Sequence, residues 1–195
     1  MTLGGQYSEL LLASTSPARA ALLSGLGLPF RAVAPEVDEY IGADTPPAHA
    51  VAILAEKKAR AVASRNPTAL VIGADQLVSL SGQAMGKAPD ASAAKRQLRS
   101  LRGRTHEILT GLCVVGPGFL SNEVDAARLT VLPLSDAEVD AYVATGEWEG
   151  CAGGYRIEGR GQTLFSRIDG DRASVQGLPM QRVVRALREA GIRFF

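Results

Sequence analysis

Three carboxylates close to predicted strands could bind a cation or activate a water molecule. Asp75 ends the apolar run Leu70–Asp75, and Asp38 and Glu39 follow the strand predicted at Phe30–Ala34. Functional groups of α/β proteins commonly lie at the carboxyl edge of the sheet, and carboxylate oxygens suit magnesium or manganese. The pattern favours Asp75 as a base or metal ligand, with Asp38 and Glu39 sharing the same cation. A turn-capping acid and a solvated acidic loop are the simpler alternatives.

A hydroxyl-rich turn in the stretch Leu10–Arg19 could bind phosphate. Ser16 is a good N-cap and Pro17 fits the first helical position, so a helix is predicted to begin at this turn. The unpaired N–H groups at the start of a helix attract phosphate oxygens, and Ser14 and Arg19 could add hydroxyl and guanidinium donors. An ordinary capped helix is the alternative.

Two lysines could neutralise the charge of a triphosphate. Lys58 lies on the helix predicted at Ala48–Arg65, and Lys87 follows the return strand of a hairpin that turns at Ser81 and Gly82. Taken alone, each is readily explained as a surface lysine, because exposed helices and loops carry many.

The elements that position these residues alternate between helices and strands but include hairpins, which favours a mixed α/β sheet over a purely parallel one. Two strands, Thr105–Val115 and about 123–132, are expected to form an antiparallel pair. The spacing of Ser135 and Glu138 predicts a capping box. Further helices are predicted at Ala91–Leu101, Ser135–Val143 and about 178–190.

Composition excludes several classes of protein. With 195 residues the chain can form one sizeable core, or two lobes that share a sheet. Its net charge of +1 gives no basic surface for a nucleic acid polymer. No apolar run reaches the roughly 18 residues of a membrane span, and no signal peptide is evident, so a cytoplasmic protein is expected. Cys113 and Cys151 form no C-x-x-C motif, so neither a disulfide nor a zinc site is predicted.

An ordered set of short motifs resembles the Maf nucleotide pyrophosphatases. The resemblance continues through Cys151–Gly159 and Val175–Pro179, and it spans roughly residues 10 to 190. Each motif is weak alone, but their order and spacing together are specific. The motifs in the first half of the chain are Leu12-Ala13-Ser14-Thr15-Ser16-Pro17-x-Arg19, Glu36-Val37-Asp38-Glu39, Leu54-Ala55-x-x-Lys58-Ala59, Ile72-Gly73-Ala74-Asp75-Gln76 and Gly86-Lys87.

The resemblance implies a single Maf-like domain over residues 1–195, with a mixed sheet, flanking helices and two lobes around a cleft, as in the inosine triphosphatases. It implies hydrolysis of a nucleoside triphosphate between the α and β phosphates with Mg²⁺ or Mn²⁺, and a possible homodimer. Asp75 matches the general base of the family. The other implied roles are phosphate binding by Ser14, Arg19, Lys58 and Lys87, and metal binding by Asp38 and Glu39 beside Asp75.

The resemblance also implies which residues recognise the base of the nucleotide substrate. Members similar to the dTTP/UTP pyrophosphatases usually carry Arg, Thr and Gln at the positions of Ala18, Gln76 and Glu158, whereas the 7-methyl-GTP branch usually carries Trp, Gln and Glu. This chain matches the second set at two positions. A carboxylate accepts from the N–H donors of guanine and favours a cationic base. Without an aromatic residue at position 18, either another ring such as Tyr155 substitutes for it, or discrimination for the methyl group is relaxed and other nucleotides are accepted.

We therefore expect a pyrophosphatase acting on 7-methyl-GTP, which would keep a modified nucleotide out of nucleic acid. One alternative keeps the reaction but changes the substrate to dTTP, UTP or several nucleotides. The other is a nucleotide-binding regulator of septum formation that needs no turnover. Loss of hydrolysis in an Asp75→Asn variant separates an enzyme from a regulator.

Overall fold

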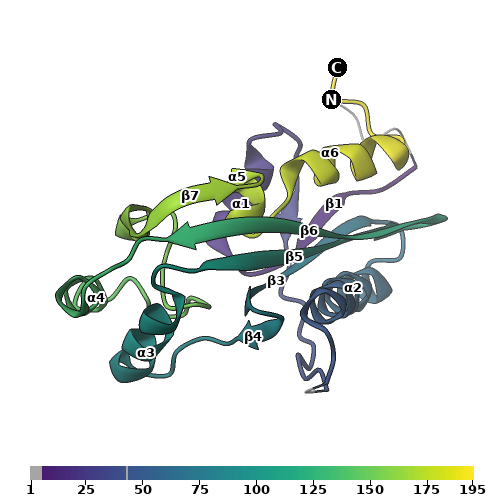
Figure 1. Ribbon diagram of the computed structural model, residues 1–195. Coiled ribbons are helices and arrows are strands. Elements are labelled where there is room, and N and C mark those ends of the chain that lie inside the picture. Colours follow the sequence, from purple (N-terminus) through teal and green to yellow (C-terminus); the bar gives the residue numbers. More distant parts are fainter. Residues whose placement is uncertain (1–5, 43) are drawn as a thin grey trace. The chain divides into compact units, whose positions relative to one another are not determined.

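A computed structural model describes residues 6–42 and 44–195 and has a mixed α/β architecture (Figure 1). The strands are β1 (Leu10–Ala13), β2 (Arg31–Ala32), β3 (Leu70–Leu80), β4 (Gln83–Met85), β5 (Thr105–Gly116), β6 (Phe119–Val131) and β7 (Phe165–Asp169). The helices are α1 (Pro17–Ser24), α2 (Pro47–Arg65), α3 (Ala91–Leu101), α4 (Asp136–Val143), the 3₁₀ helix η1 (Arg160–Leu164), α5 (Arg172–Val175) and α6 (Met180–Glu189). No helix in this described part is long and apolar enough to cross a membrane.

The sheet combines parallel and antiparallel neighbours, as predicted. Its strand order is β2-β1-β3-β5-β6-β7, and β4 pairs with β3 outside this path. β1 runs parallel to both β2 and β3, whereas the pairs β3–β4 and β6–β7 are antiparallel. Only Pro117 and Gly118 connect β5 to β6, a length that suits antiparallel neighbours.

Three predicted strand boundaries are wrong. β3 continues to Leu80, because Val78–Leu80 pair with β4, so Asp75 lies within a strand and not at its end. The strand predicted at Phe30–Ala34 is limited to Arg31 and Ala32, the residues that pair with β1. β6 begins at Phe119, before the predicted position 123.

The chain divides into two compact units. The first contains the described residues up to Gln76 together with Thr110–Asp125 and Arg172–Phe195. The second contains Leu77–Leu109 and Ala126–Asp171. Both are discontinuous in sequence, so their boundaries could not be predicted from linkers or changes in composition.

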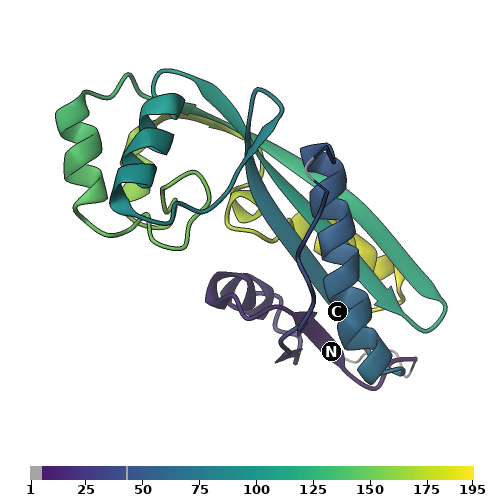
Figure 2. The ribbon, with the colours of Figure 1, turned by 90° about the horizontal axis from the view of Figure 1, so that it is seen from below.

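In the first unit, helices cover both faces of the sheet (Figures 1 and 2). On one face, Val183 and Leu187 of α6 belong to the same apolar cluster as Leu12 of β1 and Ile72 of β3. On the opposite face, α2 packs through small residues against β1, β3 and β5. A Cβ atom added at Gly73 would lie 2.5 Å from the backbone oxygen of Ala55, so α2 approaches β3 at a distance that only glycine permits.

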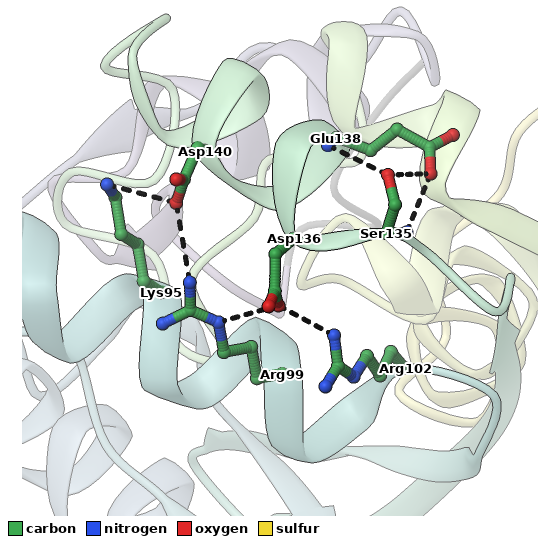
Figure 3. A network of polar contacts seen from close by, with 7 residues as sticks. All are labelled: Lys95, Arg99, Arg102, Ser135, Asp136, Glu138 and Asp140. Carbon is green, nitrogen blue, oxygen red and sulfur yellow. Dashed lines mark hydrogen bonds and ion pairs between the residues drawn. The ribbon is translucent and has the colours of Figure 1, made fainter.

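In the second unit, α3 and α4 lie side by side and are joined by charged residues (Figure 3). Asp136 accepts hydrogen bonds from Arg99 and Arg102, at 3.0 and 2.8 Å. Ser135 and Glu138 form the predicted capping box at the start of α4. The ion pairs are largely exposed to solvent, which screens their attraction, so they orient the two helices more than they stabilise them.

Candidate active site

The centre of the candidate site is the ammonium group of Lys58, which contacts two carboxylates. Lys58 Nζ lies 2.6 Å from Asp75 Oδ1 and 2.8 Å from Glu39 Oε1. Lys58 is only 7% exposed, and its charge is tolerated at this depth because both partners are anionic. The side chain of Glu39 is 62% exposed, so this carboxylate faces solvent while Asp75 is mostly covered.

The close approach of α2 to β3 accounts for this contact. Side chains two residues apart on a strand lie on the same face, so Asp75 faces α2 as Gly73 does. Lys58 neighbours Ala59, whose Cβ would be 2.8 Å from an added Cβ at Gly73. The small residues at this crossing therefore bring the lysine of a helix onto the carboxylate of a strand.

Arg19 adds a second cation beside the two carboxylates. Its Nε donates to the carbonyl oxygen of Gly177 at 2.8 Å, and its terminal nitrogen lies 3.5 Å from Ser14 Oγ. Burial lowers the pKa of Arg19, and the negative charges of Asp75 and Glu39 act in the opposite direction. A guanidinium is not deprotonated in proteins, so Arg19 carries a positive charge.

The turn before α1 has the predicted geometry. Ser16 caps the helix by accepting from the backbone N–H of Arg19 at 3.4 Å. The buried hydroxyl of Ser14 accepts from the N–H of Ser16 at 3.1 Å and lies beside Arg19. Ser14, Arg19 and the start of α1 thus form a group of donors, the arrangement that suits phosphate oxygens.

Asp38 is exposed and accepts from the backbone N–H of Tyr40 at 2.9 Å. Within residues 6–42 and 44–195, no three acidic, histidine or cysteine side chains are grouped so that they could hold a metal ion. The structure therefore joins Glu39 and Asp75 through Lys58 but does not add Asp38 to them. Two carboxylates still fit Mg²⁺ or Mn²⁺, because Mg²⁺ is commonly bound by one or two carboxylates together with substrate phosphates.

Most of the other residues predicted to bind the substrate lie on α1 or in the second unit. Ala18 is half-buried on α1. Lys87 and Glu158 belong to the second unit, where both are exposed and Lys87 forms a backbone bridge with Ala152. Tyr155 is 5% exposed, which is the wrong environment for stacking on a base.

Tyr155 belongs instead to an aromatic cluster of the second unit. Its ring lies edge-on to Phe165 at 4.9 Å between centroids, and its hydroxyl is 2.7 Å from His106 Nε2. Burial lowers the pKa of His106 to about 4, so the imidazole is neutral at pH 7. The expectation that Tyr155 substitutes for an aromatic residue at position 18 is wrong, because neighbouring rings already cover it.

Gln76 is held by residues that sequence reasoning missed. Its Nε2 donates to the carbonyl oxygens of Ser174 and Val175, at 2.7 and 3.2 Å, and to Thr110 Oγ1 at 3.0 Å. Thr110 was detectable only as a polar residue within an apolar strand. Ser174 and Val175 contribute backbone atoms, for which no side-chain pattern exists.

Residues 9–190 match the family described as Maf-like protein. The chain is 39% identical over 185 residues to the dTTP/UTP pyrophosphatase of Bacillus velezensis, covering 95% of this chain and 98% of the relative. It is 41% identical over 189 residues to the dTTP/UTP pyrophosphatase of Symbiobacterium thermophilum, covering 96% of each. A similar solved structure is the Staphylococcus aureus Ham1 protein, with a TM-score of 0.47, 15% identity, and coverage of 65% of this chain and 73% of that one. The family match spans nearly the whole chain, and the two relatives align with 95% and 96% of it: the chain belongs to the Maf-like protein family.

Proposed function

We propose that this protein is a nucleotide pyrophosphatase that hydrolyses a nucleoside triphosphate between its α and β phosphates. The observation that carries the proposal is the buried ammonium of Lys58 between Asp75 and Glu39, with Arg19 beside them. Cations and a carboxylate at one place suit phosphoryl chemistry, in which positioning and charge neutralisation supply most of the catalysis. The names of the relatives, which are dTTP/UTP pyrophosphatases, support the same reaction.

Each group of the site has a role in this reaction. Asp75 is the general base, which orients a water molecule and accepts its proton as the water attacks phosphorus. Lys58 fixes the carboxylate through its 2.6 Å contact. Arg19 and the hydroxyl of Ser14 bind phosphoryl oxygens and offset the charge that develops there. The products are a nucleoside monophosphate and pyrophosphate.

A divalent cation fits this site as an additional component. Glu39 and Asp75 would hold Mg²⁺ or Mn²⁺, and Asp38 remains a predicted ligand. Such an ion would neutralise phosphate charge and polarise the P–O bonds. Lys87 remains a predicted phosphate-binding residue.

We propose 7-methyl-GTP as the preferred substrate, because Gln76 and Glu158 are the residue types of that branch. Glu158 can only accept hydrogen bonds, and guanine offers N–H donors. The second candidate is dTTP or UTP, which the names of the relatives favour. Pyrophosphate release from 7-methyl-GTP, GTP, dTTP, UTP and CTP, with Mg²⁺ or Mn²⁺, separates the two. Exclusive hydrolysis of the pyrimidine nucleotides would overturn the first choice.

The Asp75→Asn variant tests the enzymatic role itself. Loss of the base is expected to lower kcat by about 10²–10⁴-fold while the protein still binds nucleotide. Glu9→Gln is the matched control, since Glu9 pairs with Arg31 in the same unit and lies outside the proposed machinery. Full hydrolysis by Asp75→Asn would remove Asp75 from the mechanism, whereas a wild-type protein that binds nucleotides without turnover would favour a regulator.

A further inference from the structure

Beyond the predicted site residues, the first unit contains a chain of polar contacts that ends at two of them. Ser174, which is 1% exposed, donates from Oγ to Asp125 Oδ2 at 2.5 Å. Asp125 also accepts from Arg182 Nε at 2.7 Å. The hydrogen bond to Asp125, followed by that to Glu123, raises the pKa of Arg182, so this partner is permanently charged. Asp125 thus connects α6 to the short helix α5.

The backbone of α5 and the turn after it contacts two residues of the candidate site. The carbonyl oxygen of Ser174 accepts from Gln76 Nε2 and from Thr110 Oγ1, at 2.7 and 3.0 Å. Three residues later, the carbonyl oxygen of Gly177 accepts from Arg19 Nε at 2.8 Å. One segment, 174–177, therefore orients the amide of Gln76 and the guanidinium of Arg19.

These contacts determine which way the Gln76 amide faces. Carbonyl oxygens of Ser174 and Val175 surround its nitrogen, and a rotation by 180° would place the amide oxygen against them. The rotated state would bring acceptors together and remove the donor that Gln76 supplies to the two carbonyl oxygens. The amide oxygen is accordingly the atom that remains to accept from a ligand.

We propose that Asp125 is a positioning residue that acts through Ser174 on segment 174–177, and through it on Gln76 and Arg19. In this proposal, Asp125 is assigned no contact with phosphate or base. Its carboxylate fixes the Ser174 hydroxyl, and the backbone of the same residue fixes the amide of Gln76. Thr110 is a second positioning residue, which accepts from the Gln76 amide and donates to the carbonyl oxygen of Ser174. The assignment of base reading to Gln76 rests on the proposed function, whereas the effect on Arg19 requires only that the site binds phosphate.

The neighbouring Glu123 provides a matched control. Glu123 accepts from Arg182 at 2.7 Å and from Arg185, so it belongs to the same ion network, but no hydrogen bond links it to Ser174. Glu123→Gln removes ion pairs of α6 and leaves the contact between Asp125 and Ser174. Asp125→Asn and Ser174→Ala both weaken that contact, and Ser174→Ala is the milder change if Asp125→Asn fails to fold.

The first measurement is pyrophosphate binding by calorimetry to the whole protein, with melting temperatures recorded for every variant. Asp125→Asn and Ser174→Ala are expected to weaken binding by about tenfold, because a small displacement of Arg19 is enough to lose a hydrogen bond. Glu123→Gln should bind within about twofold of wild type. Equal affinities of Asp125→Asn and Glu123→Gln at equal melting temperatures would overturn the proposal.

The second measurement is the ratio of kcat/KM between the best and the second-best nucleotide of the panel. Thr110→Val, which keeps the shape but loses the hydroxyl, should lower this ratio by about tenfold. Thr110→Ser keeps the hydroxyl and should restore the ratio. An unchanged ratio in Thr110→Val would remove Thr110 from the positioning chain. If wild type binds pyrophosphate but hydrolyses no nucleotide, the proposed function fails while the calorimetric test of Asp125 still decides this inference.

Discussion

At the scale of single residues, the buried charge of Lys58 brings two carboxylates to one place. Its ammonium group holds Asp75 and Glu39 within contact distance of one atom, although two carboxylates repel each other. The positive charge of the lysine therefore offsets the repulsion between the two carboxylates. As a predicted phosphate-binding residue, Lys58 would also be the counter-ion of a phosphate ligand in the proposed reaction.

Replacing Lys58 by Met should lower kcat/KM by at least about 100-fold, because both a phosphate partner and the anchor of Asp75 are lost. The neighbouring Lys57→Met is the control, since Lys57 is exposed and its ammonium group donates to the carbonyl oxygen of Tyr40, at 3.4 Å. Steady-state kinetics on the best nucleotide checks both variants. Equal activities would show that the charge of Lys58 is dispensable.

The burial of His106 leads to a prediction of how the free energy of unfolding depends on pH. The pKa of His106 in the folded protein is about 4, below the ordinary 6.5. Between these two pH values, the imidazole is therefore protonated in the unfolded chain but neutral in the folded one. Stability is then expected to fall as the pH drops from about 6.5 to 4, by roughly 3 kcal/mol in total. Urea unfolding of wild type and His106→Gln at pH 7 and 4.5 measures this contribution. The loss between the two pH values should be smaller in the variant, and an equal loss would contradict the assignment.

Among the secondary-structure elements, helix boundaries were predictable and strand lengths were less so. Residues Ala91–Leu101 were predicted and are observed as α3, and α2 begins one residue before the predicted Ala48. Helix caps are local signals, which the sequence carries within a few residues. The extent of β3 depends on its partner β4, and such pairing is a tertiary property.

The crossing of α2 and β3 gives a prediction for Gly73→Ala. An added Cβ at 2.5 Å from the backbone oxygen of Ala55 forces the helix away from the strand, which should destabilise the fold by about 1–3 kcal/mol or more. Because Lys58 moves with α2, the rate of hydrolysis should fall by more than the loss of folded protein accounts for. Gly86→Ala is the control for stability, since an added Cβ there meets nothing within 4 Å. Thermal unfolding and kinetics measure both effects, and a normal melting temperature for Gly73→Ala would contradict the close packing.

On the scale of the whole molecule, the sequence predicted the participants of the candidate site better than their contacts. Asp75, Lys58 and Arg19 were recognisable by type and by resemblance. Lys58 bridges two carboxylates because α2 packs closely on β3. The spacing of motifs in the sequence does not predict such a distance. The contacts of Ser174 with Gln76 and of Gly177 with Arg19 were not predictable, because backbone carbonyl oxygens make both of them.

The burial of Lys58 also makes this residue a chemical reporter of unfolding. An acylating reagent must reach a neutral amine, but the ammonium of Lys58 is 7% exposed and paired with two carboxylates. Lys57, one position earlier, is exposed. Mass spectrometry after graded labelling should find Lys57 modified early and Lys58 modified only as fast as the protein opens. Similar labelling rates at the two positions would show that the helix frays locally. If the rates differ greatly, the labelling of Lys57 reports surface access and that of Lys58 reports global opening, both in one sample.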